Sequence, residues 1–220
     1  MGIRVSVLQI LSKMLPAKRI LSLGYPDILA TKEDIIRIFG VEPASFVNTG
    51  KWHGVNHPLP ETIALFQQLG CELVCVDVHA SRGVERIVDL NEPATLGKYD
   101  IVLDLGTTEH CFNIGQALKN AVDAVDIGGR IFHTSPVTMI NHGFFNLNPT
   151  FFADFYTQNG FELELFVGCA QESFFEVPAF DRVNLPGEAS LYVVARKLSD
   201  MPIKWPTQQK YLTNPDLRIL

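Results

Sequence analysis

The chain has 220 residues, of which 47% are hydrophobic and 19% charged, and its formal net charge is −6. A chain of this length and apolar content can bury one sizeable core, which excludes disorder as a global description. The acidic balance, with no lysine–arginine cluster longer than Lys18–Arg19, argues against a phosphate-backbone binder, so no nucleic-acid partner is expected. No stretch is long and apolar enough to predict a membrane span.

Cysteine and histidine spacing indicates neither disulfides nor a metal site. The four cysteines form no C-x-x-C pair: Cys71, Cys75, Cys111 and Cys169. They are typical of buried thiols in a reducing compartment, so we expect a cytoplasmic protein. His53 and His57 lie four apart, but the glycine, asparagine and proline among and after them indicate a loop, so no metal ligand is predicted there.

The first part of the chain alternates helical and extended patterns, read from apolar periodicity and from glycine and proline signals. The predicted elements are an N-terminal helix within residues 1–16, a buried strand over 19–24, a helix over 31–39, a loop over 41–58 and a helix over 60–69. Thr31 can cap the second helix and Gly40 can end it. Pro60 suits the first turn of the third helix.

The second part continues the alternation. The predicted strands cover 72–77, 85–90, 99–105, 130–134, 161–167 and 191–196, and the predicted helices cover 113–125 and 151–158. Strands that alternate with helices of this length predict an α/β fold, doubly wound, with a mostly parallel seven-stranded sheet and helices on both faces. We expect one domain over residues 1–197 and an irregular tail over 198–220.

Residues that directly follow the strands are the candidates for chemistry, because ligands of an open parallel sheet bind at the carboxyl ends of its strands. Carboxylates recur there at Asp77, Asp89 and Asp104, which suits ribose hydroxyls and a cationic ligand better than a bare phosphate. A nicotinamide-dependent oxidoreductase is disfavoured, because no G-x-G-x-x-G sequence follows the first strand.

Six segments, taken in order, carry a family resemblance: Leu21–Gly24, Val74–Asp77, Val88–Leu90, Tyr99–His110, Asp126–Arg130 and Asn141–Pro149. Across residues 17–197 their order resembles the class I S-adenosylmethionine (SAM)-dependent methyltransferases. The first three are similar to the family's cofactor motifs, and Glu109–His110 is similar to a pair that often ends its fourth strand. The resemblance implies a Rossmann-like fold whose last strand pair is antiparallel.

The same resemblance implies a SAM site. Its cofactor-binding residues would be Gly24, Tyr25, Asp27, Asp77, Asp89, Leu90, Asp104, Gly106 and Thr107. Asp77 would accept the two ribose hydroxyls. Asp89 would lie near the adenine amine with Leu90 on the adenine face, and the turn at Gly106 and Thr107 would approach the methionine end.

The first loop departs from the family pattern. Ser22 stands where an acid is usual, and only Gly24 remains of the spaced glycines. Pro26 removes a backbone donor, and Tyr25 brings a side chain where close backbone approach is usual. Asp27 can replace the missing acid and hold the methionine ammonium. The alternative is a catalytically silent binding or assembly module that has lost SAM binding.

Two histidines are the catalytic candidates. His110 follows the fourth strand and His142 lies beyond the fifth, and imidazole is suited to deprotonating a hydroxyl near neutral pH. The alternative for His110 is a helix-entry residue bonded to nearby backbone. With the resemblance, they predict O- or N-methylation of a small-molecule acceptor, a polar metabolite or sugar, with a homo-oligomer possible. Phenylalanines over 144–156 either wall an apolar acceptor pocket or form the buried side of a helix.

Overall fold

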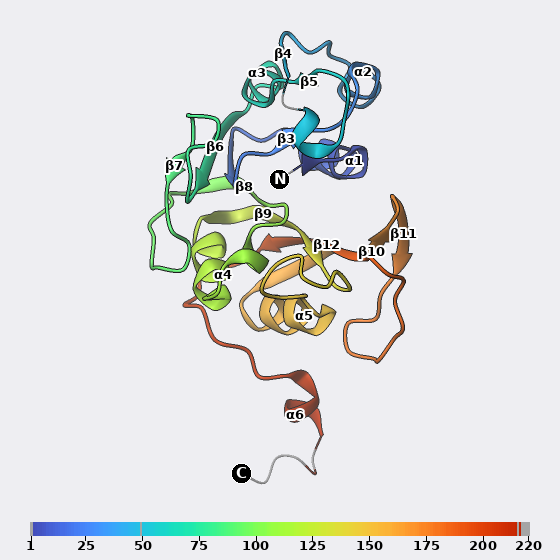
Figure 1. Ribbon diagram of the computed structural model, residues 1–220. Helices are drawn as coiled ribbons and strands as arrows, with labels where there is room; N and C mark the ends of the chain where they lie inside the picture. Colours follow the sequence, from blue (N-terminus) through green and yellow to red (C-terminus); the bar gives the residue numbers. More distant parts are fainter. Residues whose placement is uncertain (1, 49, 215, 217–220) are drawn as a thin grey trace.

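A computed structural model describes residues 2–48, 50–214 and 216 (Figure 1). Its main sheet has eight strands: β2 (Arg19–Leu23), β6 (Glu72–Asp77), β7 (Arg86–Ile87), β8 (Tyr99–Asp104), β9 (Val125–Pro136), β10 (Phe161–Ala170), β11 (Ser173–Glu176) and β12 (Ser190–Lys197). Their spatial order is β11-β10-β12-β9-β8-β2-β6-β7, so the strand order reverses direction next to β2.

The sheet has a parallel part and an antiparallel part. From β7 through β6, β2 and β8 to β9 every pairing is parallel, whereas β12 runs antiparallel to both β9 and β10. This confirms the Rossmann-like α/β fold and the antiparallel last pair. The sheet is mixed and has eight strands rather than seven, because β11 folds back onto β10 as a hairpin in which Ala170 pairs with Ser173.

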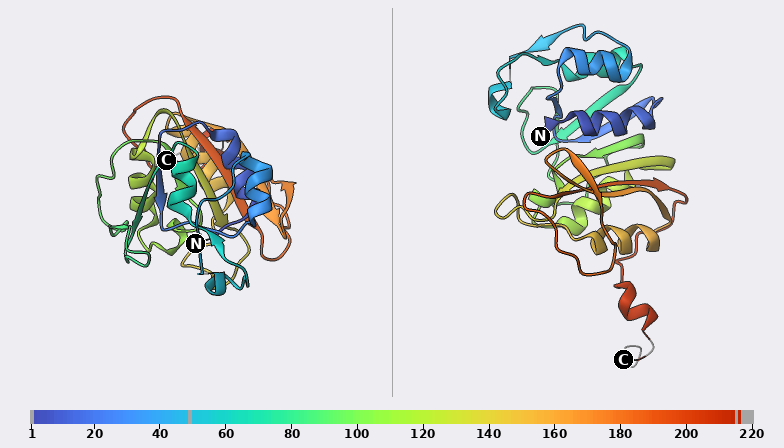
Figure 2. Two further views of the ribbon diagram at one scale, coloured as in Figure 1. Left: turned by 90° about the horizontal axis from the view of Figure 1, so that it is seen from above. Right: turned by 90° about the vertical axis from the view of Figure 1, so that its right-hand side faces the viewer.

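Helices cover both faces of the sheet, as predicted. Figures 1 and 2 show α1 (Val5–Met14), α2 (Lys32–Phe39) and α3 (Thr62–Gln68) on one side, and α4 (Ile114–Asp123) and α5 (Pro149–Gln158) on the other. Two short sheets, β1 (Gly2–Ile3) with β3 (Asp27–Ile28) and β4 (Phe46–Val47) with β5 (Leu59–Pro60), and the 3-10 turns Gly50–His53 and Thr108–His110 complete the domain.

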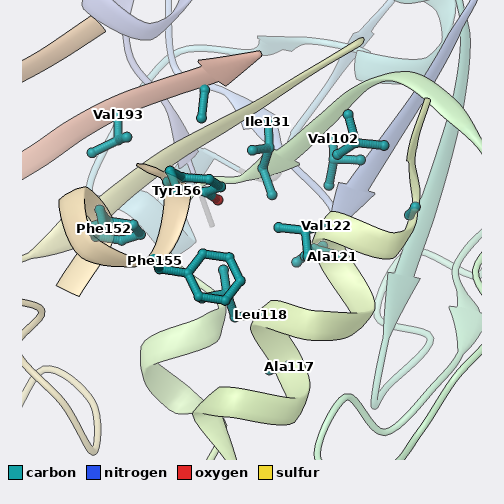
Figure 3. Packing of buried hydrophobic residues seen from close by; sticks show 14 of the residues in the cluster. Val102, Ala117, Leu118, Ala121, Val122, Ile131, Phe152, Phe155, Tyr156 and Val193 are labelled. Atoms are coloured by element: carbon teal, nitrogen blue, oxygen red, sulfur yellow. The ribbon is translucent and has the colours of Figure 1, made fainter. Parts of the chain in front are cut away.

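A large apolar cluster fills the space between the sheet and the helices α4 and α5. Figure 3 shows Phe155 of α5 beside Leu118 of α4 and Tyr156 on the side of Ile131 of β9, and Phe152 belongs to the same cluster. The three aromatic side chains are at most 2% exposed. Burial of aromatic side chains on this scale is a major source of core stability. The aromatic spacing after residue 150 therefore reports the buried side of a helix, not a pocket wall.

Local signals set both ends of α2, whereas the start of α3 differs from its prediction. Thr31 and Asp34 form a capping box, and Gly40 ends α2 in the left-handed conformation at φ 70°, as predicted. The prediction that Pro60 lies in the first turn of α3 is wrong. Pro60 belongs to β5, and the Glu61 side chain caps the helix by accepting the N–H groups of Ile63 and Ala64.

Two strands differ from their predicted bounds. The strand expected over 85–90 shortens to β7, and the Glu85 carboxylate accepts the backbone N–H groups of Arg82 and Val84 in the preceding loop. β9 begins at Val125 and continues through Gly129, whose Cβ would lie 2.8 Å from the carbonyl oxygen of Asp100. Glycine thus permits close strand packing there instead of ending an element.

The two chain ends add short ordered elements to the predicted pattern. α1 occupies only residues 5–14 of the expected 1–16 helix and follows β1; Met1 lies outside the described residues. The expected irregular tail contains α6 (Gln209–Thr213) and is tied to α5 through paired hydrogen bonds between Asn159 and Lys204. Residues 215 and 217–220 of that tail also lie outside the described part, and the domain boundary at 197 stays a prediction.

Two further predictions concern buried thiols and membrane spans. All four cysteines are buried and free, which confirms that they are core residues. Among the described residues, no helix has the length and apolar character needed to cross a membrane.

Candidate functional site

A cavity of about 380 Å³ opens at the carboxyl ends of β2, β6 and β8, and we call it the sheet-end cavity. Seven of the nine predicted cofactor residues line it: Gly24, Tyr25, Asp27, Asp77, Leu90, Gly106 and Thr107. They are brought together because the strands that precede them are parallel neighbours. The order of the strand-end residues along the chain thus predicted a shared location.

The other two predicted cofactor residues, Asp89 and Asp104, do not line the sheet-end cavity. Asp89 is exposed, and its Oδ1 accepts hydrogen bonds from the backbone and side-chain nitrogens of Asn91, at 2.9 and 2.8 Å. Asn91, which the sequence analysis did not single out, lines the cavity in its place. Asp89 therefore fixes the loop that carries Asn91.

Asp104 is fully buried and anchors the turn that follows β8. Its Oδ1 accepts the N–H groups of Thr107 and Thr108 at 3.1 Å, and its Oδ2 lies 2.7 Å from Nδ1 of His133. The other ring nitrogen of His133 lies 2.5 Å from the hydroxyl of Tyr156. Burial would raise the pKa of Asp104, but the hydrogen bond with His133 holds it below its usual value. The network fixes the turn in which Gly106 adopts φ 100°.

The loop after β2, which departs from the family pattern, is held in place by hydrogen bonds. Gly24 has φ 88°, and its N–H donates to the carbonyl of Val76 at 2.6 Å. Tyr25 is 8% exposed and donates its hydroxyl to Glu61 at 2.6 Å, which holds the side chain at the wall of the sheet-end cavity. Ser22 is completely buried, so its hydroxyl does not take the place of the usual acid in the cavity. The chain then enters β3 at Asp27.

Asp27 faces the sheet-end cavity as part of a charged cluster. Its Oδ2 lies 2.5 Å from a guanidinium nitrogen of Arg82 and 2.9 Å from Nε2 of His53. Arg82 also lies over the Tyr25 ring, 5.5 Å from its centroid. Sequence reasoning passed over Arg82, although its position in the loop after β6 was a usable signal. Glu85 holds this loop, because its carboxylate accepts the N–H of Arg82 at 2.9 Å.

A second, larger cavity of about 920 Å³ adjoins the first, and we call it the hairpin cavity because the β10–β11 hairpin forms one wall. Gly106 and His110 line both cavities. Three non-glycine residues on its wall have positive φ: Gln171 at 50°, Glu172 at 61° and Glu188 at 55°. Gln171 and Glu172 form the two-residue turn of the β10–β11 hairpin, in which positive φ at both positions is usual.

The two predicted catalytic histidines meet on the wall of the hairpin cavity, beside a buried acid. The rings of His110 and His142 are 5.2 Å apart, and Nε2 of His142 lies 3.5 Å from Oε1 of Glu109. One ligand-type atom from each of the three residues lies within 4.8 Å of the others. The glutamate appeared in the sequence analysis only as part of a family-like pair.

The protonation of this cluster follows from its burial. Glu109 has no exposed side-chain surface, and neither carboxylate oxygen has a hydrogen-bond partner among the described residues. Burial, then the charge of Asp104, raises the pKa of Glu109 to about 8. Burial, followed by the neighbouring His142, lowers the pKa of His110, which favours its neutral imidazole. A neutral imidazole can accept a proton or bind a metal ion.

A close backbone contact brings the His142 loop onto Glu109. The N–H of Phe144 donates to the carbonyl of Glu109 at 2.9 Å. A Cβ at Gly143 would lie only 2.9 Å from the same carbonyl oxygen, so glycine is required at this crossing. The preceding residue, Asn141, has φ 61°, which turns the chain before His142.

Comparisons with known proteins agree on the architecture. No protein-family model and no curated protein sequence matches the chain. Among solved structures, it is similar to the N-methyltransferase NodS from Bradyrhizobium japonicum WM9 in complex with S-adenosyl-L-homocysteine (SAH). The identity is 13%, the TM-score is 0.50, and the match covers 89% of this chain and 86% of that one. This chain has the class I methyltransferase fold.

A second similar structure is the 1,6-didemethyltoxoflavin-N1-methyltransferase of Burkholderia thailandensis, with 16% identity and a TM-score of 0.47. That match covers 89% of this chain and 77% of the other. At 13% identity the likeness to NodS shows the fold alone, so the chemistry must be argued from the two cavities of this chain.

Proposed function

We propose that the protein is a SAM-dependent methyltransferase that methylates an oxygen or nitrogen atom of a small polar metabolite or sugar. The observation that carries the proposal is the meeting of two cavities at Gly106 and His110, on the ligand-binding edge of a methyltransferase fold. Methyl transfer is an in-line displacement, which requires donor and acceptor to approach through one shared opening.

In this proposal the sheet-end cavity holds the cofactor. Asp77 accepts the two ribose hydroxyls, as a carboxylate after the second strand does in dinucleotide-binding folds. Leu90 packs against the adenine, and the backbone at Gly106 and Thr107 approaches the methionine end. The bound SAH of the NodS crystal supports this arrangement, because it places the demethylated cofactor in a protein of the same fold.

The Asp27–Arg82 pair is the candidate site for the amino-acid end of SAM. That end carries an ammonium and a carboxylate, and the pair offers one charge of each sign on the cavity wall. Ligand charges can bind to such a pair without leaving an unpaired buried charge. The loop can thus lose its usual acid at Ser22 and still bind a zwitterion. His53 then keeps Asp27 oriented at 2.9 Å.

The hairpin cavity is the candidate acceptor site. Its wall carries hydroxyl, imidazole and carboxylate groups, which suit a polar acceptor. In this proposal, the imidazole of His110 or of His142 accepts the proton that the acceptor loses. As the acceptor's lone pair forms the bond to the methyl carbon, the carbon–sulfur bond breaks, sulfur keeps its electron pair, and the imidazole takes the proton.

Calorimetric titration of the full chain with SAM and with SAH tests the proposal. We expect both to bind at one site per chain, and NAD, used as a control nucleotide, not to compete. Failure of both ligands to bind at millimolar concentration would contradict the proposal and favour the silent binding module. The cytoplasmic location and a homo-oligomeric state stay predictions.

A further inference from the structure

We propose that Glu109, His110 and His142 bind a divalent transition-metal ion, and that this ion holds an oxygen atom of the acceptor. The three residues lie on the wall of the hairpin cavity, and His110 also borders the sheet-end cavity. The ion would therefore sit where donor and acceptor meet. The part that concerns the acceptor rests on the proposed function, whereas the metal site itself does not.

The geometry of the cluster fits an ion with little rearrangement. Two ligand atoms that are each about 2.1 Å from a tetrahedral ion are roughly 3.4 Å apart. Oε1 of Glu109 and Nε2 of His142 are 3.5 Å apart. The third ligand atom, from His110, is within 4.8 Å of both, and the exposed His110 side chain can close the remaining gap by a small rotation.

The buried carboxylate is the independent observation that points to a ligand. Buried polar groups are normally hydrogen-bonded, and burying an unpaired charge is costly. Both oxygens of Glu109 lack a hydrogen-bond partner among the described residues, and Nε2 of the exposed His142 lies 3.5 Å from Oε1. A bound cation would supply the missing partner and keep the carboxylate ionised.

Glycines keep the surroundings of this carboxylate free of other side chains. A Cβ at Gly106 would lie 3.4 Å from Oε1 of Glu109, and one at Gly143 would lie 3.1 Å from its Cγ. Both glycines border the cluster, one from the turn after β8 and the other from the His142 loop. Side chains in place of these glycines would crowd Glu109, which lies on the wall of the hairpin cavity.

The donor set selects the class of metal. Two imidazole nitrogens and one carboxylate oxygen suit zinc, manganese or ferrous iron, whereas magnesium and calcium prefer sites made of oxygen ligands. Three protein ligands leave at least one position for an exchangeable ligand. We assign that position to a hydroxyl of the acceptor, which reaches it from the hairpin cavity.

This site changes the role of the two imidazoles. As metal ligands they do not take the acceptor's proton themselves. A metal-bound hydroxyl loses its proton more readily, and here the proton passes to solvent in the open hairpin cavity. The oxygen lone pair then forms the bond to the methyl carbon while sulfur leaves with the electron pair of the carbon–sulfur bond.

Calorimetry on the chelator-treated full chain tests the site with Zn²⁺ and with Mn²⁺ alone. We expect one ion per chain, and at least about tenfold weaker binding in Glu109→Gln and in His142→Ala, since even the loss of outer-shell partners has effects of this size. His57→Ala is the matched control, because this histidine lies outside the cluster. The metal affinity of this variant should equal that of the wild type.

The outcomes separate this inference from the proposed function. Equal metal affinity in the wild type, Glu109→Gln and His142→Ala would overturn the metal site, as would the absence of binding at millimolar concentration. SAH is titrated into the same samples. Binding of SAH without metal binding would overturn only the metal site, and metal binding without SAH binding would contradict the methyltransferase proposal alone. Circular dichroism of each variant checks that it is folded.

Discussion

The two cavities differ in how their charged groups are satisfied. On the wall of the sheet-end cavity, Asp27 is paired with Arg82 and His53 before any ligand arrives. On the wall of the hairpin cavity, Glu109 is buried without a hydrogen bond among the described residues. The first cavity is therefore preorganised, whereas the second is completed by what binds there. Preorganisation reduces the cost of ordering side chains when a ligand binds.

The largest expected effect on stability comes from breaking the buried network around Asp104, which fixes the turn that borders both cavities. Asp104→Ala leaves His133 buried with one partner lost and releases the N–H groups of the turn after β8. The Asp104 carboxylate accepts several buried hydrogen bonds, and each donor left unsatisfied costs about 1–3 kcal/mol, so a total of about 3–5 kcal/mol is expected. We expect urea denaturation to show a loss of this size in the free energy of unfolding. Asp123→Ala is the control, because its pair with Lys119 is exposed and should change stability by about 0.5 kcal/mol or less. Similar losses in the two variants would show that the network is not a main support.

The stabilising contribution of the Asp104 network should be lost in acid. Because the folded pKa of Asp104 lies below its unfolded value, its stabilising contribution is complete above about pH 4 and is lost as the pH falls through the folded pKa. The difference in unfolding free energy between the wild type and Asp104→Asn should be constant from neutral pH to about pH 5 and shrink below about pH 4. A difference that does not change with pH would mean that Asp104 has the same pKa in the folded and unfolded protein, which would contradict the account.

The cofactor assignment can be sharpened with two acids that the sequence analysis grouped together. Asp77 lines the sheet-end cavity, and its replacement by alanine should remove about 1.5–3 kcal/mol of binding free energy, roughly a ten- to hundredfold loss of SAH affinity. Asp89 lies outside the lining and acts through Asn91, so Asp89→Ala should weaken SAH binding less. Calorimetry on both variants decides the order. A larger effect at Asp89 would contradict the placement of the ribose.

A smaller effect is expected from Gly143→Ala, and it should be confined to the hairpin cavity. The added methyl group meets the carbonyl of Glu109, and overpacking of this kind costs about 1–3 kcal/mol. The displaced loop should carry His142 away from Glu109 and weaken metal binding while SAH affinity stays unchanged. Loss of both affinities would show that the two cavities do not respond independently.

The fold could be predicted from local patterns, because each core strand is a short apolar run and most helices carry their own start and stop signals. The capping box at Thr31 and Asp34 is local in sequence and was predictable. The start of α3 was not, because β5 takes Pro60 from the helix by pairing with β4. β9 likewise runs through its glycine pair because Gly129 packs against a neighbouring strand.

The candidate site was predictable only where it lies at strand ends. Parallel pairing brings Gly24, Asp77 and Gly106 to one cavity, so their positions along the chain were sufficient. The partnership of Asp27 with Arg82 spans 55 residues and depends on how two loops fold. Glu109 has no local pattern that reveals its burial, which arises when the His142 loop crosses its backbone at Gly143.

A crystal structure of the full chain with SAH tests the central claim most directly. The account predicts the ribose hydroxyls on Asp77, the amino-acid end beside Asp27 and Arg82, and the sulfur atom at the opening between Gly106 and His110, directed toward the hairpin cavity. Electron density for SAH outside the sheet-end cavity, or a sulfur atom directed away from His110, would contradict it.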